Sequence, residues 1–133
     1  MSGRCYARSV AGYGLTADQW ERAREELRAE LVSTAAARTT VTYGELARRI
    51  QAADLHARSR ALYALLQEAC AAEDAAGRPT IGSVVVTRAT GIPGDGYFCF
   101  ADDRLGRDVS DRRAYWNAEI TRVWDAWSDR DAG

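Results

Sequence analysis

The sequence predicts an α+β domain of the winged helix-turn-helix type, with three N-terminal helices, a β-hairpin wing and an aromatic C-terminal helix. Three observations predict this order. Residues 39–66 read as two short helices joined by a turn, a glycine-rich segment between two apolar runs follows them, and tryptophans at helical spacing close the chain.

Length and composition predict a single domain over residues 1–133. A chain of 133 residues can bury one core, and 47% hydrophobic with 28% charged residues is typical of globular proteins. We expect residues 1–15 to form a loose arm or one short strand, and residues 128–133 to fray.

The expected location is the cytoplasm. The N-terminus lacks the apolar run of a signal peptide, and no run approaches the roughly 18 apolar residues of a membrane span. Cys5, Cys70 and Cys99 lack metal-ligand spacing, and their odd number does not make a disulfide framework. We interpret all three as free thiols in a reducing compartment, and expect no membrane association.

Two capping boxes predict where the first two helices begin. Thr16 and Gln19 have the spacing in which a hydroxyl and an amide side chain cap each other's backbone, and Thr42 and Glu45 repeat it. The first helix then carries a stripe of apolar residues at helical spacing. These residues are Trp20, Ala23, Leu27 and Leu31.

The second helix is expected to be short and to end before a turn at residues 51–57. A third helix follows from about Arg58 or Ser59 to about Ala76, and Gly77 is a natural residue to end it. Its apolar stripe consists of Leu62, Leu65, Leu66 and Ala69.

The wing is predicted from residues 80–100. Residues 80–87 follow Pro79 and contain three successive valines, which favours a strand. Pro93 and Gly94 fit the centre of a type II turn, and residues 97–100 read as the returning strand. Gly94 and Gly96 would form the wing tip.

The last helix is predicted to start at Ser110 or Asp111. A broad aromatic and apolar stripe follows at helical spacing. It consists of Trp116, Ile120, Val123, Trp124 and Trp127.

Basic charge is concentrated on the predicted helix-turn-helix. All 18 basic residues are arginine and the whole chain carries a net charge of −1, so a nucleic-acid interface has to be local. Residues 38–60 hold five arginines against Glu45 and Asp54, a net charge of +3. This face either contacts phosphates or is an ordinary solvated helix surface.

Residues 40–91 resemble a known family. Val41 to Ala47 (VTYGELA), Arg60-Ala61-Leu62 and the strand ending at Gly91 are similar to the C-terminal domain of alkylguanine-DNA alkyltransferases and alkyltransferase-like proteins. The resemblance implies a winged helix-turn-helix that binds the DNA minor groove. It also implies that Tyr43 lies near the phosphate of a flipped nucleotide, and that Arg60 is the finger inserted into the base stack.

The chain departs from that family at the reactive motif. Gly82-Ser83-Val84-Val85 stands where the family has Pro-Cys-His-Arg, so alkyl transfer to a thiolate is excluded at that position. Tyr63 also stands where the family has a glycine. The resemblance therefore favours binding rather than catalysis.

We therefore predict a non-catalytic protein that binds DNA, double-stranded in form, without a metal or cofactor. The expected contacts are Thr42, Tyr43, Arg48, Arg58, Arg60, Gly94 and Gly96. One alternative is a protein-interaction module that docks a partner or a second copy through the aromatic C-terminal helix. The other is a small enzyme at the loop from Gly91 to Tyr97, using Asp95 with Tyr43 or His56.

Overall fold

The computed structural model of the protein describes the backbone of residues 13–132 and the side chains of residues 13–128. This part of the chain forms α-helices, one 3₁₀-helix and two very short strands. In chain order they are α1 (Ala17–Ala36), β1 (Val41–Thr42), α2 (Tyr43–Arg49), α3 (Arg60–Ala75), η3 (Ile81–Val84), β2 (Val85–Val86), α4 (Asp95–Asp103) and α5 (Arg112–Ala132). Most of the arm expected at residues 1–15 lies outside the described residues.

Both predicted capping boxes are confirmed. The Thr16 hydroxyl accepts a hydrogen bond from the Gln19 amide at 3.0 Å, and the Gln19 side chain accepts one from the Thr16 amide at 2.9 Å. Thr42 and Glu45 make the same reciprocal pair at the start of α2, at 3.2 Å each. Two backbone amides at each helix start are thereby satisfied. The end of α3 is also as predicted, because Gly77 follows it with φ +79°.

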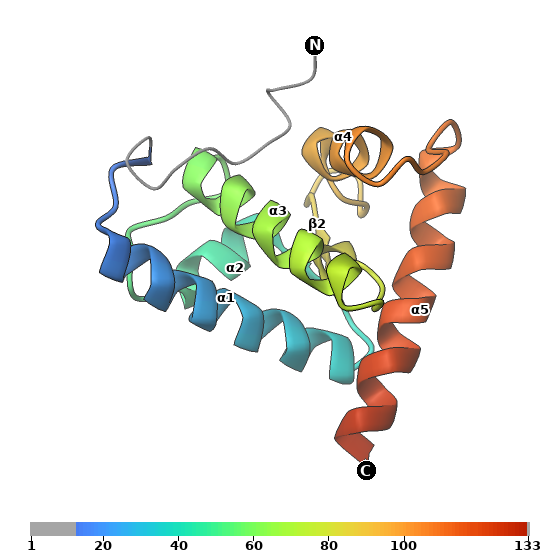
Figure 1. Cartoon of the computed structure of the whole chain (residues 1–133), viewed down its shortest axis with the longest axis horizontal. Helices are drawn as coiled ribbons and strands as arrows, with labels where there is room; N and C mark the ends of the chain where they lie inside the picture. Colours follow the sequence, from blue (N-terminus) through green and yellow to red (C-terminus); the bar gives the residue numbers. More distant parts are fainter. Residues whose placement is uncertain (1–12, 133) are drawn as a thin grey trace.

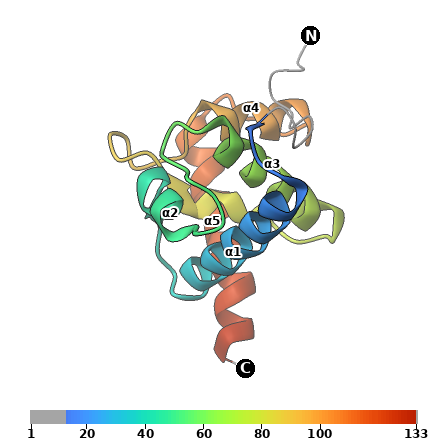
Figure 2. The same ribbon diagram turned by 90° about the vertical axis from the view of Figure 1, so that its left-hand side faces the viewer.

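The helices surround η3 and β2. α1 and α3 run side by side, and α5 crosses near their C-terminal ends (Figure 1). Figure 2 shows α2 on one flank and α3 on the other, with α4 at the end of the molecule opposite the C-terminus. η3 contacts α1, α3 and α5, and Ile81, Ser83 and Val84 are completely buried there. The segment where the resembled family carries its reactive motif is thus the centre of the core.

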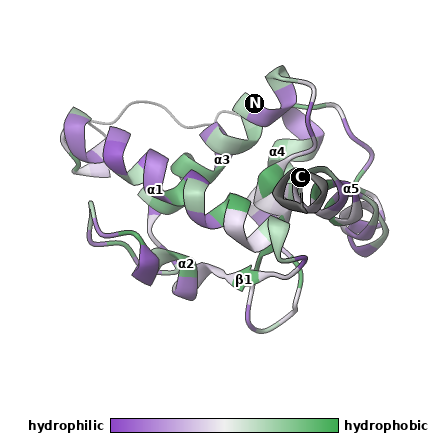
Figure 3. Cartoon of the chain, turned by 90° about the horizontal axis from the view of Figure 1, so that it is seen from below, coloured by the Kyte–Doolittle hydropathy of each residue, from purple (hydrophilic) through white to green (hydrophobic). Residues whose placement is uncertain are grey.

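The predicted apolar stripes of α1 and α5 both face this core. Leu27 and Leu31 of α1 and Ile120 and Val123 of α5 are at most 2% exposed. Hydrophilic residues cover the outer turns of α1 and α2 (Figure 3). Hydrophobic burial on these stripes is the main contribution that holds the helices together.

A buried carboxylate connects α1, α3 and α5. Glu73 of α3 is 2% exposed and pairs with Arg28 of α1 at 3.1 Å and with Arg78 at 2.5 Å. Both guanidinium groups lie over the ring of Trp127 in α5, at 5.4 and 5.9 Å from its centre. The two cations compensate the cost of burying the carboxylate.

The predicted β-hairpin wing, and with it the winged-helix fold class, is wrong. β2 has two residues and pairs in parallel with β1, Val41 opposite Val85. Residues 97–100, expected to return as a strand, lie in α4, where Phe98 and Ala101 are buried on one helix face. A four-residue apolar run is too short for its periodicity to distinguish strand from helix. The described residues are mainly helical.

The glycines of the expected wing tip begin a helix instead. Gly94 has φ −81° and is the N-cap residue of α4, so it is not the left-handed centre of a type II turn. The positive φ in this segment is at Gly91, with +75°. Gly96 lies within the first turn of α4.

Two smaller expectations are corrected as well. The backbone of α5 continues to Ala132, so most of the tail expected to fray is helical. Cys99 is disulfide-bonded, whereas Cys70 is a buried free thiol, because a cysteine count alone does not determine pairing. Cys5 lies outside the described residues. None of the described helices is both long and apolar enough to cross a membrane.

Candidate functional site

Three of the predicted contact residues form what we call the arginine surface: Arg48, Arg58 and Arg60. All three side chains are exposed, and none forms an ion pair with a carboxylate of the described residues. The other two arginines of the same segment are paired, Arg38 with Asp125 at 3.1 Å and Arg49 with Glu30 at 3.3 Å. Of the five arginines in residues 38–60, these three therefore form no ion pair within the described residues.

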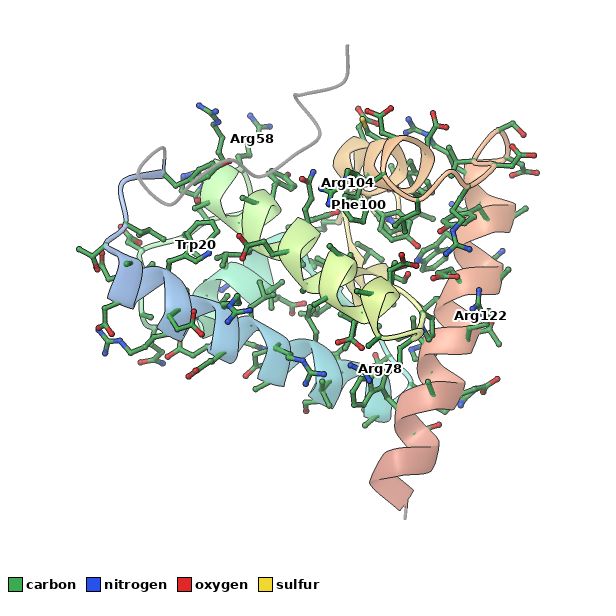
Figure 4. The ribbon with its side chains drawn as sticks, viewed as in Figure 1. Trp20, Arg58, Arg78, Phe100, Arg104 and Arg122 are labelled. Carbon is green, nitrogen blue, oxygen red and sulfur yellow. The ribbon has the colours of Figure 1, made fainter. Side chains whose placement is uncertain are left out.

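Gly44 brings the two parts of the arginine surface together. A Cβ built on Gly44 would lie 3.6 Å from Nη1 of Arg48 and 3.9 Å from Cβ of Ala57, the residue before Arg58. The guanidinium of Arg48 thus lies against the start of α2, next to the loop that leads into α3. Arg58 points away from the body of the molecule at the N-terminal end of α3 (Figure 4).

Arg60 has an aromatic neighbour. Its guanidinium carbon lies 5.9 Å from the centre of the Tyr13 ring, a cation–π distance. Tyr13 in turn stacks on Trp20 of α1, with ring centres 5.4 Å apart. This contact orients Arg60 without neutralising its charge.

The remaining predicted contacts lie elsewhere. The Thr42 hydroxyl is engaged in capping α2. Tyr43 is 7% exposed, and its hydroxyl accepts a hydrogen bond from the Gly94 amide at 3.0 Å. Gly94 and Gly96 stand at the start of α4, beside a pocket rather than at a wing tip. Tyr43 is therefore a wall residue of that pocket, and its position does not match that of an open phosphate contact.

We call this cavity the aromatic pocket; it opens between α3, α4 and the start of α2. Its empty space, open mouth included, is about 460 Å³. Its wall is mostly aromatic and apolar, and Phe100 lies on the side of α4 that faces α3 (Figure 4). Its lining includes Tyr43, Tyr63, Gln67, Cys70, Gly82 and Tyr97.

Tyr63 connects the aromatic pocket to the arginine surface. Its hydroxyl donates to the carbonyl of Ala57 at 3.0 Å, and its ring lies 5.4 Å from that of Tyr43 at a tilt of 52°. At 36% exposed it is the large hydrophobic side chain with the greatest exposure among the described residues. Sequence reasoning missed Tyr63 as a site residue, although its place on the polar edge of α3 next to Arg60 was a usable signal.

On the floor of the aromatic pocket, the thiol of Cys70 occupies the space that a side chain at residue 82 would need. A Cβ built on Gly82 would lie only 2.7 Å from Sγ of Cys70, so the thiol occupies the space that glycine leaves. Burial raises the pKa of the Cys70 thiol to about 12, although the Gly82 amide donates to its sulfur. The thiol is therefore protonated at neutral pH and is a weak nucleophile.

A chain of hydrogen bonds runs from the pocket wall into the core. Ser83 donates its proton to the Thr80 carbonyl at 2.8 Å, so the Tyr97 hydroxyl, 2.6 Å from Ser83 Oγ, is the donor of that pair. The Thr80 amide and hydroxyl both donate to the buried Glu119 carboxylate at 2.9 Å. Burial is also the main reason why the pKa of Tyr97 lies far above its usual value.

The groups proposed for the two alternative functions are engaged in structural contacts. Asp95 pairs with Arg112 at 2.7 Å, and the ring nitrogen Nδ1 of His56 accepts from the Arg58 amide at 3.3 Å. Trp116 and Trp127 of α5 are buried, and the Trp124 indole donates to the Thr39 carbonyl at 3.0 Å. The aromatic stripe of α5 thus packs against its own chain.

No family model matches the chain, and no curated protein or solved structure matches it with significance.

Proposed function

We propose that this protein binds double-stranded DNA through the arginine surface and does not change it covalently. The observation that carries the proposal is the contrast between paired and unpaired arginines within residues 38–60. Arg38 and Arg49 are bound by carboxylates, whereas Arg48, Arg58 and Arg60 form no ion pair among the described residues. An exposed guanidinium without an ion pair keeps its full capacity for phosphate oxygens.

The aromatic pocket supplies a second part of the proposed interaction. A base that leaves the stack next to Arg58 would meet Tyr63 first, because Tyr63 contacts both the loop before Arg58 and the pocket wall. Stacking of a base on an aromatic side chain contributes about 1–3 kcal/mol, and extruding a base costs a few kcal/mol. The stacking energy offsets the cost of extrusion best at a mismatched or damaged base, because such a base costs least to extrude. We therefore propose alkyltransferase-like recognition of such positions.

Binding is proposed rather than catalysis because the titratable groups of the pocket keep their protons. Burial raises the pKa of Tyr43 and of Cys70 to about 12 each. At neutral pH the pocket therefore presents neutral walls, which suit an uncharged base better than acid–base or thiolate chemistry.

A titration against single- and double-stranded DNA at several salt concentrations tests the proposal. Three phosphate contacts predict that the logarithm of the binding constant falls with the logarithm of salt concentration with a slope of about −2.7 for a duplex. A duplex with one mismatched pair is expected to bind more tightly than its matched counterpart at every salt concentration. No binding to any duplex at low salt would contradict the proposal.

A further inference from the structure

Gln67, a residue of the pocket wall, carries a buried polar atom without a hydrogen-bond partner among the described residues. It follows Tyr63 by four residues on α3, so both side chains lie on one helix face, and both line the pocket. Its Oε1 atom is buried and accepts no hydrogen bond from any of the described residues. The nearby tyrosine hydroxyls of Tyr63 and Tyr97 donate elsewhere, to Ala57 and Ser83.

A buried acceptor without a donor is uncommon in native proteins and costs stability. That cost is recovered when a bound molecule supplies an N–H group. Since the rest of the wall is mostly aromatic and apolar, the complementary ligand is a flat ring with an N–H donor on its edge.

We infer that Gln67 determines which base the aromatic pocket accepts, by accepting a hydrogen bond at Oε1 from an amino or imino group on the edge of the extruded base. This inference rests on the proposed function, because the arginine surface has to hold the duplex beside the pocket. A base that lacks such a group leaves Oε1 unpaired and binds more weakly.

Two duplexes that differ by one amino group test this inference. Each carries a single test base opposite an abasic site, so that no base pair has to be broken; the test base is adenine in one duplex and unsubstituted purine in the other. Wild-type protein is titrated with both at several salt concentrations. We expect the adenine duplex to bind about tenfold more tightly, the factor given by a free-energy difference of about 1.4 kcal/mol.

Two variants make the comparison specific to Gln67. Gln67→Leu keeps an apolar side chain of similar size and removes the acceptor, so it is expected to bind both duplexes equally and with an unchanged salt slope. Gln51→Leu, the same change at an exposed position before α3, is the matched control and is expected to keep the preference for adenine. Because Gln67→Leu removes an unpaired buried acceptor, its thermal stability is not expected to fall.

The outcomes separate this inference from the function on which it rests. A steep salt slope with equal binding of both duplexes by wild-type protein overturns the role of Gln67 and leaves DNA binding in place. A preference for adenine that persists in the Gln67→Leu variant also overturns the role of Gln67. Absence of salt-dependent binding to either duplex overturns the proposed function and the inference together.

Discussion

The hydroxyl of Tyr43 accepts a hydrogen bond from the backbone amide of Gly94 at 3.0 Å, which joins the first residue of α2 to the N-cap of α4. This bond spans 51 residues of sequence and closes one wall of the aromatic pocket next to the arginine surface. The start of α2 therefore holds both Arg48 and the pocket in place.

Tyr43→Phe removes the hydroxyl while keeping the ring. The Gly94 amide loses its acceptor, so we expect the free energy of unfolding to fall by about 1 kcal/mol. Urea unfolding measures this as a lower midpoint with an unchanged slope. An unchanged midpoint would show that the bond between α2 and α4 does not stabilise the fold.

The close approach of Gly82 and Cys70 predicts strong coupling between substitutions at the two positions. Gly82→Ala places a methyl group 2.7 Å from Sγ and is expected to destabilise the protein by about 1–3 kcal/mol. Cys70→Ala removes the sulfur, so Gly82→Ala in that background should cost much less. A double-mutant cycle by urea unfolding measures the difference, and simple additivity of the two losses would contradict the contact.

High pH is expected to unfold the protein. Burial raises the pKa of Tyr43 and of Tyr115 to about 12, whereas an exposed tyrosine titrates near 10. The unfolded state then binds fewer protons than the folded state, so stability is full below pH 10 and falls as pH rises from about 10 to 12. Phenolate absorbance and far-ultraviolet circular dichroism should change together in this window. Complete phenolate formation with the helices intact would contradict the burial of these rings.

The thiol of Cys70 should resist alkylation in the folded protein. Its pKa of about 12 leaves almost no thiolate at pH 8, and the side chain is only 5% exposed. Mass spectrometry of the peptide that contains Cys70 after iodoacetamide treatment is expected to show slow labelling in buffer and rapid labelling in urea. Equal rates in the two conditions would show that the pocket floor is open to reagents.

The sequence predicts the helix boundaries well where local chemistry decides them. The hydroxyl of Thr16, the capping pair Thr42 and Glu45, and the left-handed Gly77 act within one helix turn, so their roles can be read from spacing. The segment of residues 91–100 is different, because its glycines and aromatic residues suit a hairpin and a helix start equally well. Packing of Phe98 into the core favours the helix α4 over a hairpin.

The arginine surface could be anticipated from sequence and the aromatic pocket could not. The basic excess of residues 38–60 can be counted directly from the sequence. The structure adds which of these arginines form ion pairs. The pocket requires α3, α4 and the start of α2 to meet, so the roles of Tyr63 and Gln67 depend on contacts between distant parts of the chain. No periodicity within α3 reports on such contacts.

The salt dependence of duplex binding in two matched variants tests the central claim most directly. Arg58→Ala/Arg60→Ala removes two cations of the arginine surface, whereas Arg22→Ala/Arg24→Ala removes two from exposed ion pairs on α1. Both variants change the net charge equally, so a general electrostatic effect would change the salt dependence of binding alike in both. We predict that the slope of log binding constant against log salt concentration flattens by about 1.8 in the first variant and stays unchanged in the second. Equal slopes in the two variants would contradict a DNA-binding role for the arginine surface.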